Sequence, residues 1–194
     1  MLLTLGLVAS VFNYNRFELL VKYFFICILC DMKTAHKIFS LSELEVKVGE
    51  LKKQGKKIVA TNGAFDVFHI GQKILLEESK LLGDILVVGI NSDASVRQYK
   101  SKLRPIIPER ERAEVVAALA CVDYVHIFGE KDPGAFLKAV HPDVYTKGGD
   151  YTVEQNIQAD FVRENVDKVI IIPGRVQSTT NIIEKILKIY KEDS

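Results

Sequence analysis

The chain has 194 residues, of which 48% are apolar, so it can bury one substantial core. Its 26 basic and 25 acidic residues leave a formal charge of +1, which argues against a global basic surface for nucleic acid. Three cysteines argue against a disulfide framework, and the pair Cys27 and Cys30 has no further ligands at zinc spacing. We therefore expect a cytoplasmic protein without a protein-bound metal.

The first 31 residues contain two apolar runs, MLLTLGLVASVF and LLVKYFFICILC, separated by NYNRFE. Neither run reaches the roughly 20 residues that a membrane-spanning helix needs, and no basic segment precedes the first run. A membrane-surface anchor, a dispensable extension and residues read upstream of a start at Met32 are the open alternatives. We favour the last two and expect no membrane association.

From residue 40 onward, amphipathic helices alternate with short apolar strands. Ser40 and Glu43 form a capping-box pattern ahead of a helix that Gly55 ends. The expected strands are KIVAT (57–61), DILVVGINS (84–92), VDYVHIF (122–128), DVYTKGGD (143–150) and KVIIIP (168–173). The expected helices between and after them are KILLEESKLLG, SDASVRQYK, ERERAEVVAALA, PGAFLKAV, QADFVREN and STTNIIEKILKIY.

Strands separated by helices of about ten residues indicate right-handed βαβ crossovers. The sequence therefore predicts a doubly wound, Rossmann-like α/β domain with a five-stranded parallel sheet and helices on both faces. We expect three segments: an extension (1–31), a lead-in with the first helix (32–56) and the main domain (57–194). In such sheets the ligand lies beyond the carboxyl ends of the strands, where the strand order reverses.

The stretch TNGAFDVFHIGQ, residues 61–72, follows the first strand and enters a helix. Gly63 allows a tight turn, and Gly71 allows a ligand or a helix to approach closely. A helix that begins near Gly71 directs free N–H groups at the turn, which suits a phosphate, and His69 can add a donor. The alternative is that His69 only packs against the helix or caps it.

The other strand ends carry polar residues of the same kind. Hydroxyls of Ser178, Thr179 and Thr180 begin the last helix, and a lysine, two glycines and an aspartate end the fourth strand (147–150). Each group has an ordinary explanation as a helix cap or a polar turn. A Pro-containing loop adds Lys100, Lys102 and Arg104, which are either a solvated basic run or a mobile cover for a phosphate site.

The order of these motifs resembles the cytidylyltransferase-like nucleotidyltransferases, and within them the bacterial heptose 1-phosphate adenylyltransferases. The resemblance rests on TNGAFDVFHIG, GINSDASVR, PERERAEVVAAL, VDYVHIF, HPDVYTKGGDY and STTNIIEKI, from about residue 57 to 187. The KGGDY stretch is its most specific part, because it separates heptose-type members from enzymes acting on glycerol phosphate or phosphocholine.

The resemblance implies transfer of AMP from ATP, with Mg²⁺, to a heptose 1-phosphate, giving ADP-heptose and pyrophosphate for lipopolysaccharide synthesis. It also implies a homodimer. The implied catalytic residues are His69, Gln72, Lys100 and Arg112. The implied nucleotide-binding residues are Asn62, Gly63, Ala64, Phe65, His69, Gly71, Gln72, Asn91, Asp93, Ser178, Thr179 and Thr180. The implied sugar-phosphate residues are Asp66, Lys147, Gly148, Gly149 and Asp150.

The chain departs from the family's HxGH signature at its last position, where it has Gln72. A glutamine amide donates a hydrogen bond but carries no charge, and charge-assisted hydrogen bonds are about twice as strong. We therefore expect a slowed enzyme. The alternatives are a catalytically impaired protein that binds nucleotide or sugar phosphate, and a cytidylyltransferase that uses CTP and a small phospho-alcohol.

Overall fold

The computed structural model describes residues 34–149, 160–173 and 178–192. The chain divides into two compact units, residues 1–36 and 37–194, and the sheet lies in the second unit. A short 3₁₀ helix, η1 (Thr34–Lys37), spans the boundary.

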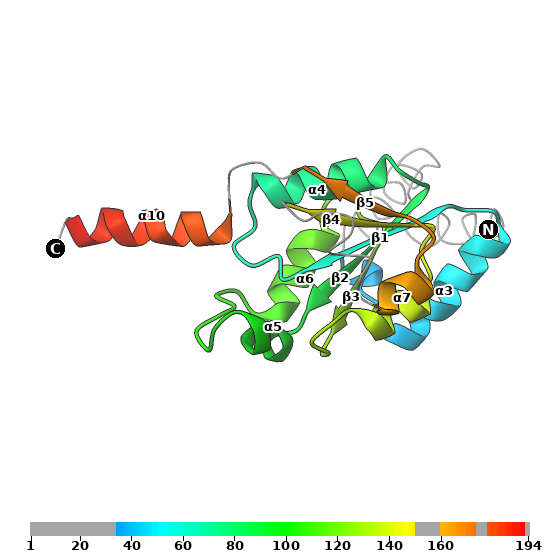
Figure 1. Cartoon of the computed structure of the whole chain (residues 1–194), viewed down its shortest axis with the longest axis horizontal. Helices are drawn as coiled ribbons and strands as arrows, with labels where there is room; N and C mark the ends of the chain where they lie inside the picture. Colours follow the sequence, from blue (N-terminus) through cyan, green and yellow to red (C-terminus); the bar gives the residue numbers. More distant parts are fainter. Residues whose placement is uncertain (1–33, 150–159, 174–177, 193–194) are drawn as a thin grey trace, which may run out of the picture. The chain divides into compact units, whose positions relative to one another are not determined.

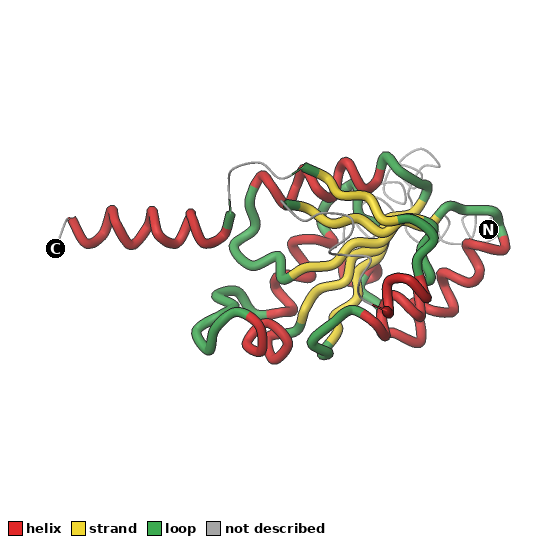
Figure 2. The backbone as a smooth tube through the Cα atoms, in the orientation of Figure 1, coloured by secondary structure: helices red, strands yellow, loops and turns green. Residues whose placement is uncertain are grey.

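Five parallel strands form the sheet of the second unit (Figures 1 and 2). They are β1 (Ile58–Gly63), β2 (Ile85–Asn91), β3 (Tyr124–Phe128), β4 (Val144–Gly148) and β5 (Val169–Ile172). Their order across the sheet is β3-β2-β1-β4-β5, and every neighbouring pair is parallel. The predicted five-stranded, doubly wound α/β fold is confirmed.

Helices cover both faces of the sheet because alternate residues of each strand enter different cores. Val59 of β1 packs with Leu76 and Val116 in one core, whereas Ile58 packs with Leu44 and Phe136 in the other. The helices are α3 (Leu41–Lys53), α4 (Ile70–Lys80), α5 (Asp93–Tyr99), α6 (Glu109–Ala117), α7 (Gly134–Val140), α9 (Asp160–Asn165) and α10 (Thr179–Glu192). Helices α4 and α6 supply the first core, and α3, α7 and α9 supply the second.

The expected capping box at Ser40 and Glu43 is present at the start of α3. The Ser40 side chain accepts from the Glu43 N–H, and a Glu43 oxygen accepts from the Ser40 N–H at 2.9 Å. Leu44, Val48 and Leu51 of this helix are buried in the core of the sheet domain. The first helix, which we grouped with the lead-in (32–56), is therefore an integral layer of the main domain.

The order of strands reverses between β1 and β4. The chain proceeds from β1 outward to β2 and β3, then returns to place β4 on the opposite side of β1. Thr61 of β1 lies opposite Thr146 of β4, so the two strands end together. The carboxyl ends of β1 and β4 therefore define the switch point at which a doubly wound sheet binds its ligand.

The end of β1 differs from the expectation in one respect. The strand continues through Asn62 and Gly63, which pair with β2, so Gly63 does not make the turn. Phe65 and Val67 have positive φ angles of 50° and 48° and reverse the chain instead. An added Cβ at Gly63 would lie 3.3 Å from the Phe65 ring, so glycine is needed there for packing rather than for the turn.

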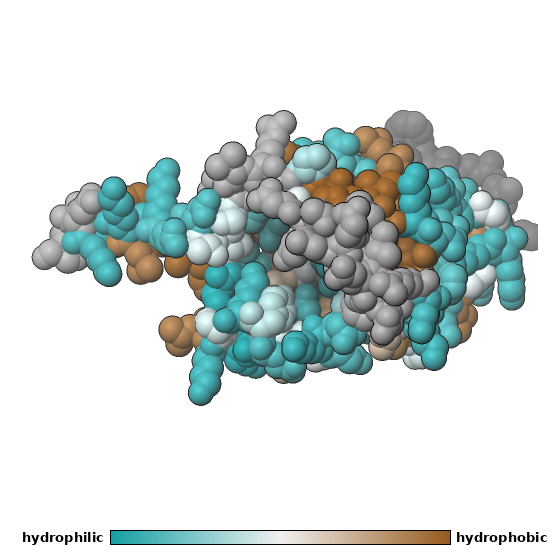
Figure 3. All heavy atoms as spheres, viewed as in Figure 1, coloured by the Kyte–Doolittle hydropathy of each residue, from teal (hydrophilic) through white to brown (hydrophobic). Residues whose placement is uncertain are grey.

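Helix α10 is amphipathic, and part of its apolar side is open to solvent. Ile186, Leu187 and Ile189 are each about half exposed, and hydrophobic and hydrophilic atoms alternate along this helix in Figure 3. Among the described residues, no helix combines the length and apolar character needed to cross a membrane.

Candidate active site

His69 is the N-cap of α4, and its imidazole is only partly buried. Its Nδ1 accepts a hydrogen bond from the Gly71 N–H at 3.2 Å, so the neutral ring carries its proton on Nε2. Burial, together with the nearby Lys100, lowers the pKa of His69 below its usual range. His69 therefore caps the helix, as one of the two alternatives had it, while the donor role of its Nε2–H toward a ligand stays a prediction.

Gln72 completes a capping box with His69. Its Oε1 accepts from the His69 N–H at 3.1 Å, which fixes the orientation of the amide. The Nε2 group of Gln72 has no acceptor among the hydrogen bonds of the described chain. The residue that replaces the signature histidine therefore holds the turn together through its oxygen and keeps a neutral donor on its nitrogen.

Asp66 connects the end of β1 to the Pro-containing loop of residues 100–108 between α5 and α6, which we call the basic loop. Its carboxylate accepts from the backbone N–H groups of Ile106 and Ile107 at 3.0 Å and from Arg104 Nε at 2.7 Å. Burial raises the pKa of Asp66, but these hydrogen bonds outweigh burial and lower it overall. The side chain is fully enclosed. We therefore assign Asp66 a positioning role in place of the expected contact with the sugar phosphate.

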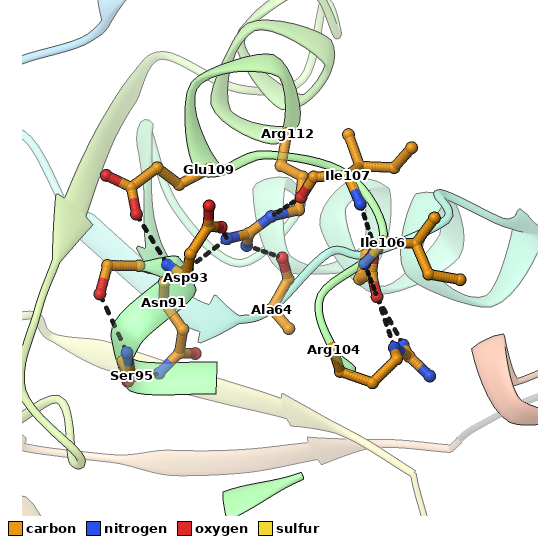
Figure 4. A network of polar contacts seen from close by, with 11 residues as sticks. Ala64, Asn91, Asp93, Ser95, Arg104, Ile106, Ile107, Glu109 and Arg112 are labelled. Carbon is orange, nitrogen blue, oxygen red and sulfur yellow. Dashed lines mark hydrogen bonds and ion pairs between the residues drawn. The ribbon is translucent and has the colours of Figure 1, made fainter. Parts of the chain in front are cut away.

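Arg112 is buried, with 1% of its surface exposed, and every bond it makes is to the protein (Figure 4). Its Nη1 donates to the carbonyl of Ala64, and its Nη2 lies 2.8 Å from both the Asn91 carbonyl and Asp93 Oδ1. Its Nε donates to the Ile107 carbonyl at 2.8 Å. This arginine joins the ends of β1 and β2 to the basic loop. We therefore replace its expected direct catalytic role with a positioning role.

The Asn91 side chain also turns inward, because its Nδ2 donates to Ser95 Oγ at 3.0 Å on α5 (Figure 4). Ser92 is the N-cap of α5, and its oxygen accepts from the Ser95 N–H. The carboxylate of Asp93 is partly exposed while it pairs with Arg112. Of the two residues expected to bind nucleotide here, Asp93 is thus the more accessible.

Lys100 brings positive charge to the His69 turn. It lies at the C-cap of α5, and no hydrogen bond or ion pair joins its ammonium group to the described residues. Burial lowers the pKa of Lys100, and the charge of Arg104 lowers it further. Arg104 is paired with Asp66 and Arg112 with Asp93, so the ammonium group of Lys100 adds a positive charge that no carboxylate of the described residues pairs with, which suits a phosphate.

Lys147 lies at the end of β4, on the other side of the switch point. Its Nζ donates to Asn62 Oδ1 at 2.7 Å, and the Tyr145 hydroxyl donates to the same oxygen. Sequence reasoning missed Tyr145, although its position two residues before Lys147 places both side chains on one face of the strand.

The glycines after Lys147 are required by the backbone and by packing. A Cβ on Gly148 would lie 3.3 Å from Leu75 of α4, and Gly149 has a φ of 110°. The Gly149 N–H also donates to the Ile172 carbonyl at 3.3 Å. Asp150, which was expected to bind the sugar phosphate, lies outside the described residues.

The hydroxyls at the start of α10 have three different environments. Ser178 Oγ accepts from the Asn181 N–H at 3.2 Å as a helix cap, and Thr180 is exposed. Thr179 is buried and donates to the Asp66 carbonyl at 2.7 Å. This last bond places the start of α10 against the loop between β1 and α4, so the N-termini of α4 and α10 both adjoin this loop.

Among the described residues, no group of three or more His, Cys, Asp and Glu side chains gathers as metal ligands. The two carboxylates nearest the turn, Asp66 and Asp93, are already paired with arginines.

Comparison with known proteins decides the family. The sequence profile described as cytidylyltransferase-like matches residues 60–188. The chain belongs to the cytidylyltransferase-like family. Over 160 residues it is 48% identical to the bifunctional protein HldE of Geobacter metallireducens and 44% identical to HldE of Geobacter sulfurreducens. These matches cover 81% of this chain and 32% of each relative, so the chain spans about a third of their length.

Solved structures show a similar fold. The lipopolysaccharide core biosynthesis protein of Thermoplasma volcanium is 31% identical, with a TM-score of 0.54 over 64% of this chain and 100% of that chain. Pantoate-beta-alanine ligase of Francisella tularensis is 16% identical, with a TM-score of 0.53 over 72% of this chain and 67% of that chain. The latter likeness concerns the fold alone.

Proposed function

We propose that this cytidylyltransferase-like protein transfers AMP from ATP to a heptose 1-phosphate and releases pyrophosphate. The observation that carries the proposal is the convergence of two helix starts at the switch point, joined by the bond from Thr179 to the Asp66 carbonyl. Helix N-termini and the nearby Lys100 favour a polyphosphate. Lys147 at the neighbouring strand end favours a second anion, which is the arrangement that two phosphorylated substrates require.

The proposed reaction needs no covalent intermediate. A phosphate oxygen of the sugar attacks the α-phosphorus of ATP, the bond to the β-phosphate oxygen breaks, and pyrophosphate leaves with that electron pair. The protein's contribution is to align two anions and to stabilise charge on the phosphoryl oxygens. The Nε2–H of His69, the amide of Gln72 and the ammonium of Lys100 are the donors positioned for this role.

The remaining expectations extend this proposal. The similarity to HldE proteins and to a lipopolysaccharide core biosynthesis protein supports a role in making ADP-heptose for surface glycan. We further propose a cytoplasmic homodimer, for which the exposed apolar side chains of α10 are the supporting observation. Sedimentation equilibrium of the full chain tests the dimer.

Pyrophosphate release tests the reaction directly. The full chain is incubated with MgATP and D-glycero-β-D-manno-heptose 1-phosphate, and released pyrophosphate is measured against a reaction without sugar phosphate. We expect release that depends on both substrates and is weaker with CTP than with ATP. Binding of ATP without any release would favour the impaired binding protein, and faster turnover with CTP and glycerol 3-phosphate would favour the cytidylyltransferase alternative.

A further inference from the structure

Lys147 is an ammonium group whose protein partner is neutral. Its Nζ donates to Asn62 Oδ1 and lies 5.3 Å from the centre of the Tyr145 ring. No carboxylate of the described residues lies within ion-pair distance of it. An ammonium group has three N–H donors, so two of them lack an acceptor among the hydrogen bonds of the described chain. A partly buried cation of this kind gains from a nearby anion.

Asn62 and Tyr145 hold this ammonium group in place. The amide oxygen of Asn62 has two lone pairs, and it accepts from the Tyr145 hydroxyl and from Lys147. These two hydrogen bonds therefore fix the orientation of the Asn62 amide. Burial raises the pKa of Tyr145 far above its usual range, so this side chain stays a neutral donor and supplies no negative charge.

Among the described residues, the following charged groups of neighbouring elements are paired within the protein or exposed to solvent. Asp66, after β1, is held by Arg104 and by backbone N–H groups. Lys138 of α7 and Glu164 of α9, the helices that cover this face of the sheet, are exposed to solvent. On β5, the residue that pairs with Lys147 is an isoleucine, at position 171. Burial is accordingly the cause that lowers the pKa of Lys147 to about 8.

We propose that Lys147, held by Asn62 and Tyr145, takes up a proton from solvent when the phosphate of the acceptor substrate binds beside it. Neutral amine, phosphate dianion and one proton then give an ammonium–phosphate pair, and no bond of the substrate breaks. The inference rests on the proposed function, because it assigns this strand end to the sugar phosphate. Its consequence is that acceptor affinity falls at alkaline pH.

The number of protons taken up on binding follows from the titration of Lys147 in the ligand-free protein. With a midpoint near pH 8, Lys147 is mostly neutral at pH 8.5, so binding takes up about 0.8 proton per site, compared with about 0.1 at pH 7.2. The affinity should fall about tenfold or more between pH 7.5 and pH 9.5, because the protein must first recover the proton.

Isothermal titration calorimetry measures this uptake. The full chain is titrated with D-glycero-β-D-manno-heptose 1-phosphate at pH 8.5 in two buffers of different ionisation enthalpy, without Mg²⁺. The ligand phosphate is a dianion at this pH and exchanges no proton itself. Lys147→Arg keeps the charge at every pH and should bind without uptake. Lys73→Arg is the matched control, since Lys73 pairs with Glu77 on the exposed side of α4, and it should behave like wild type.

The possible outcomes separate the proton-uptake inference, the proposed function and the assignment to Lys147. Binding by wild type without uptake at pH 8.5 overturns the inference and leaves the proposed function standing, because Lys147 would already be charged. No binding at any pH overturns the proposed function. Uptake that persists in Lys147→Arg overturns the assignment to Lys147. If Lys147→Arg does not bind, NMR of ¹³Cε-labelled lysines decides: the resonance absent from Lys147→Met should titrate near pH 8 and move to higher pH with ligand.

Discussion

Arg112 is a buried cation and Lys147 a partly buried one, both near the carboxyl ends of the central strands, yet their surroundings are opposite. Arg112 donates to three carbonyl oxygens and to the carboxylate of Asp93, so its charge is compensated within the protein. Among the described residues, Lys147 has one amide oxygen as its hydrogen-bond acceptor, and burial lowers its pKa to about 8. The comparison teaches that a compensated buried cation holds the fold together, whereas an uncompensated one is available to a ligand.

Replacing Arg112 should produce the largest effect. Arg112→Met leaves Asp93 and three carbonyl groups without their donor, and loss of one partner of a buried pair typically costs about 3–5 kcal/mol. We expect the free energy of unfolding to fall by this amount in urea denaturation. Arg112→Lys should recover less than half of it, because an ammonium group lacks the planar fork of donors. Wild-type stability in Arg112→Met, with lost turnover alone, would contradict the positioning role.

Replacing Lys147 should change stability in the opposite direction. Lys147→Met removes a buried charge, so we expect a gain on the order of 1–3 kcal/mol at pH 7, with loss of sugar-phosphate binding. The folded pKa is lowered, so the unfolded state binds more protons between pH 8 and 10.5 and wild type regains stability there. The gain should therefore be complete below pH 8 and disappear toward pH 10.5. Urea denaturation at several pH values checks this, and a destabilised variant at pH 7 would contradict it.

The turn at His69 presents neutral donors rather than a buried or partly buried cation. Of the three substitutions, Gln72→His should give the smallest change in free energy. A histidine in place of the neutral amide can offer a charged donor to the phosphates, so we expect kcat to rise at least tenfold, about 1.4 kcal/mol, with ATP affinity nearly unchanged. Steady-state kinetics with both substrates checks this. An unchanged or lower kcat would show that the capping bond from Gln72 to the His69 N–H matters more than the added charge.

Much of the site could be predicted because strand-end motifs are local signals. The capping box of α3, the five strands and the polar residues after them follow from periodicity, caps and turn residues. The turn after β1 was misassigned because Phe65 and Val67, which adopt positive φ, are not residues that favour it. The surrounding contacts, above all those of Asp66, hold this backbone in a conformation that local propensity does not favour.

The sequence by itself determined the alternation of elements, the parallel sheet and the set of polar residues at its carboxyl edge, since these depend on neighbours along the chain. Only the tertiary structure decided which of those side chains are fully occupied by hydrogen bonds and ion pairs within the protein. Arg112 and Asp66 are separated by 46 positions from each other, and their partners come from three different segments. Whether a charged side chain has an oppositely charged partner depends on which groups meet in space. Arg112 is buried and paired with Asp93, whereas the hydrogen-bond partner of the partly buried Lys147 is a neutral amide.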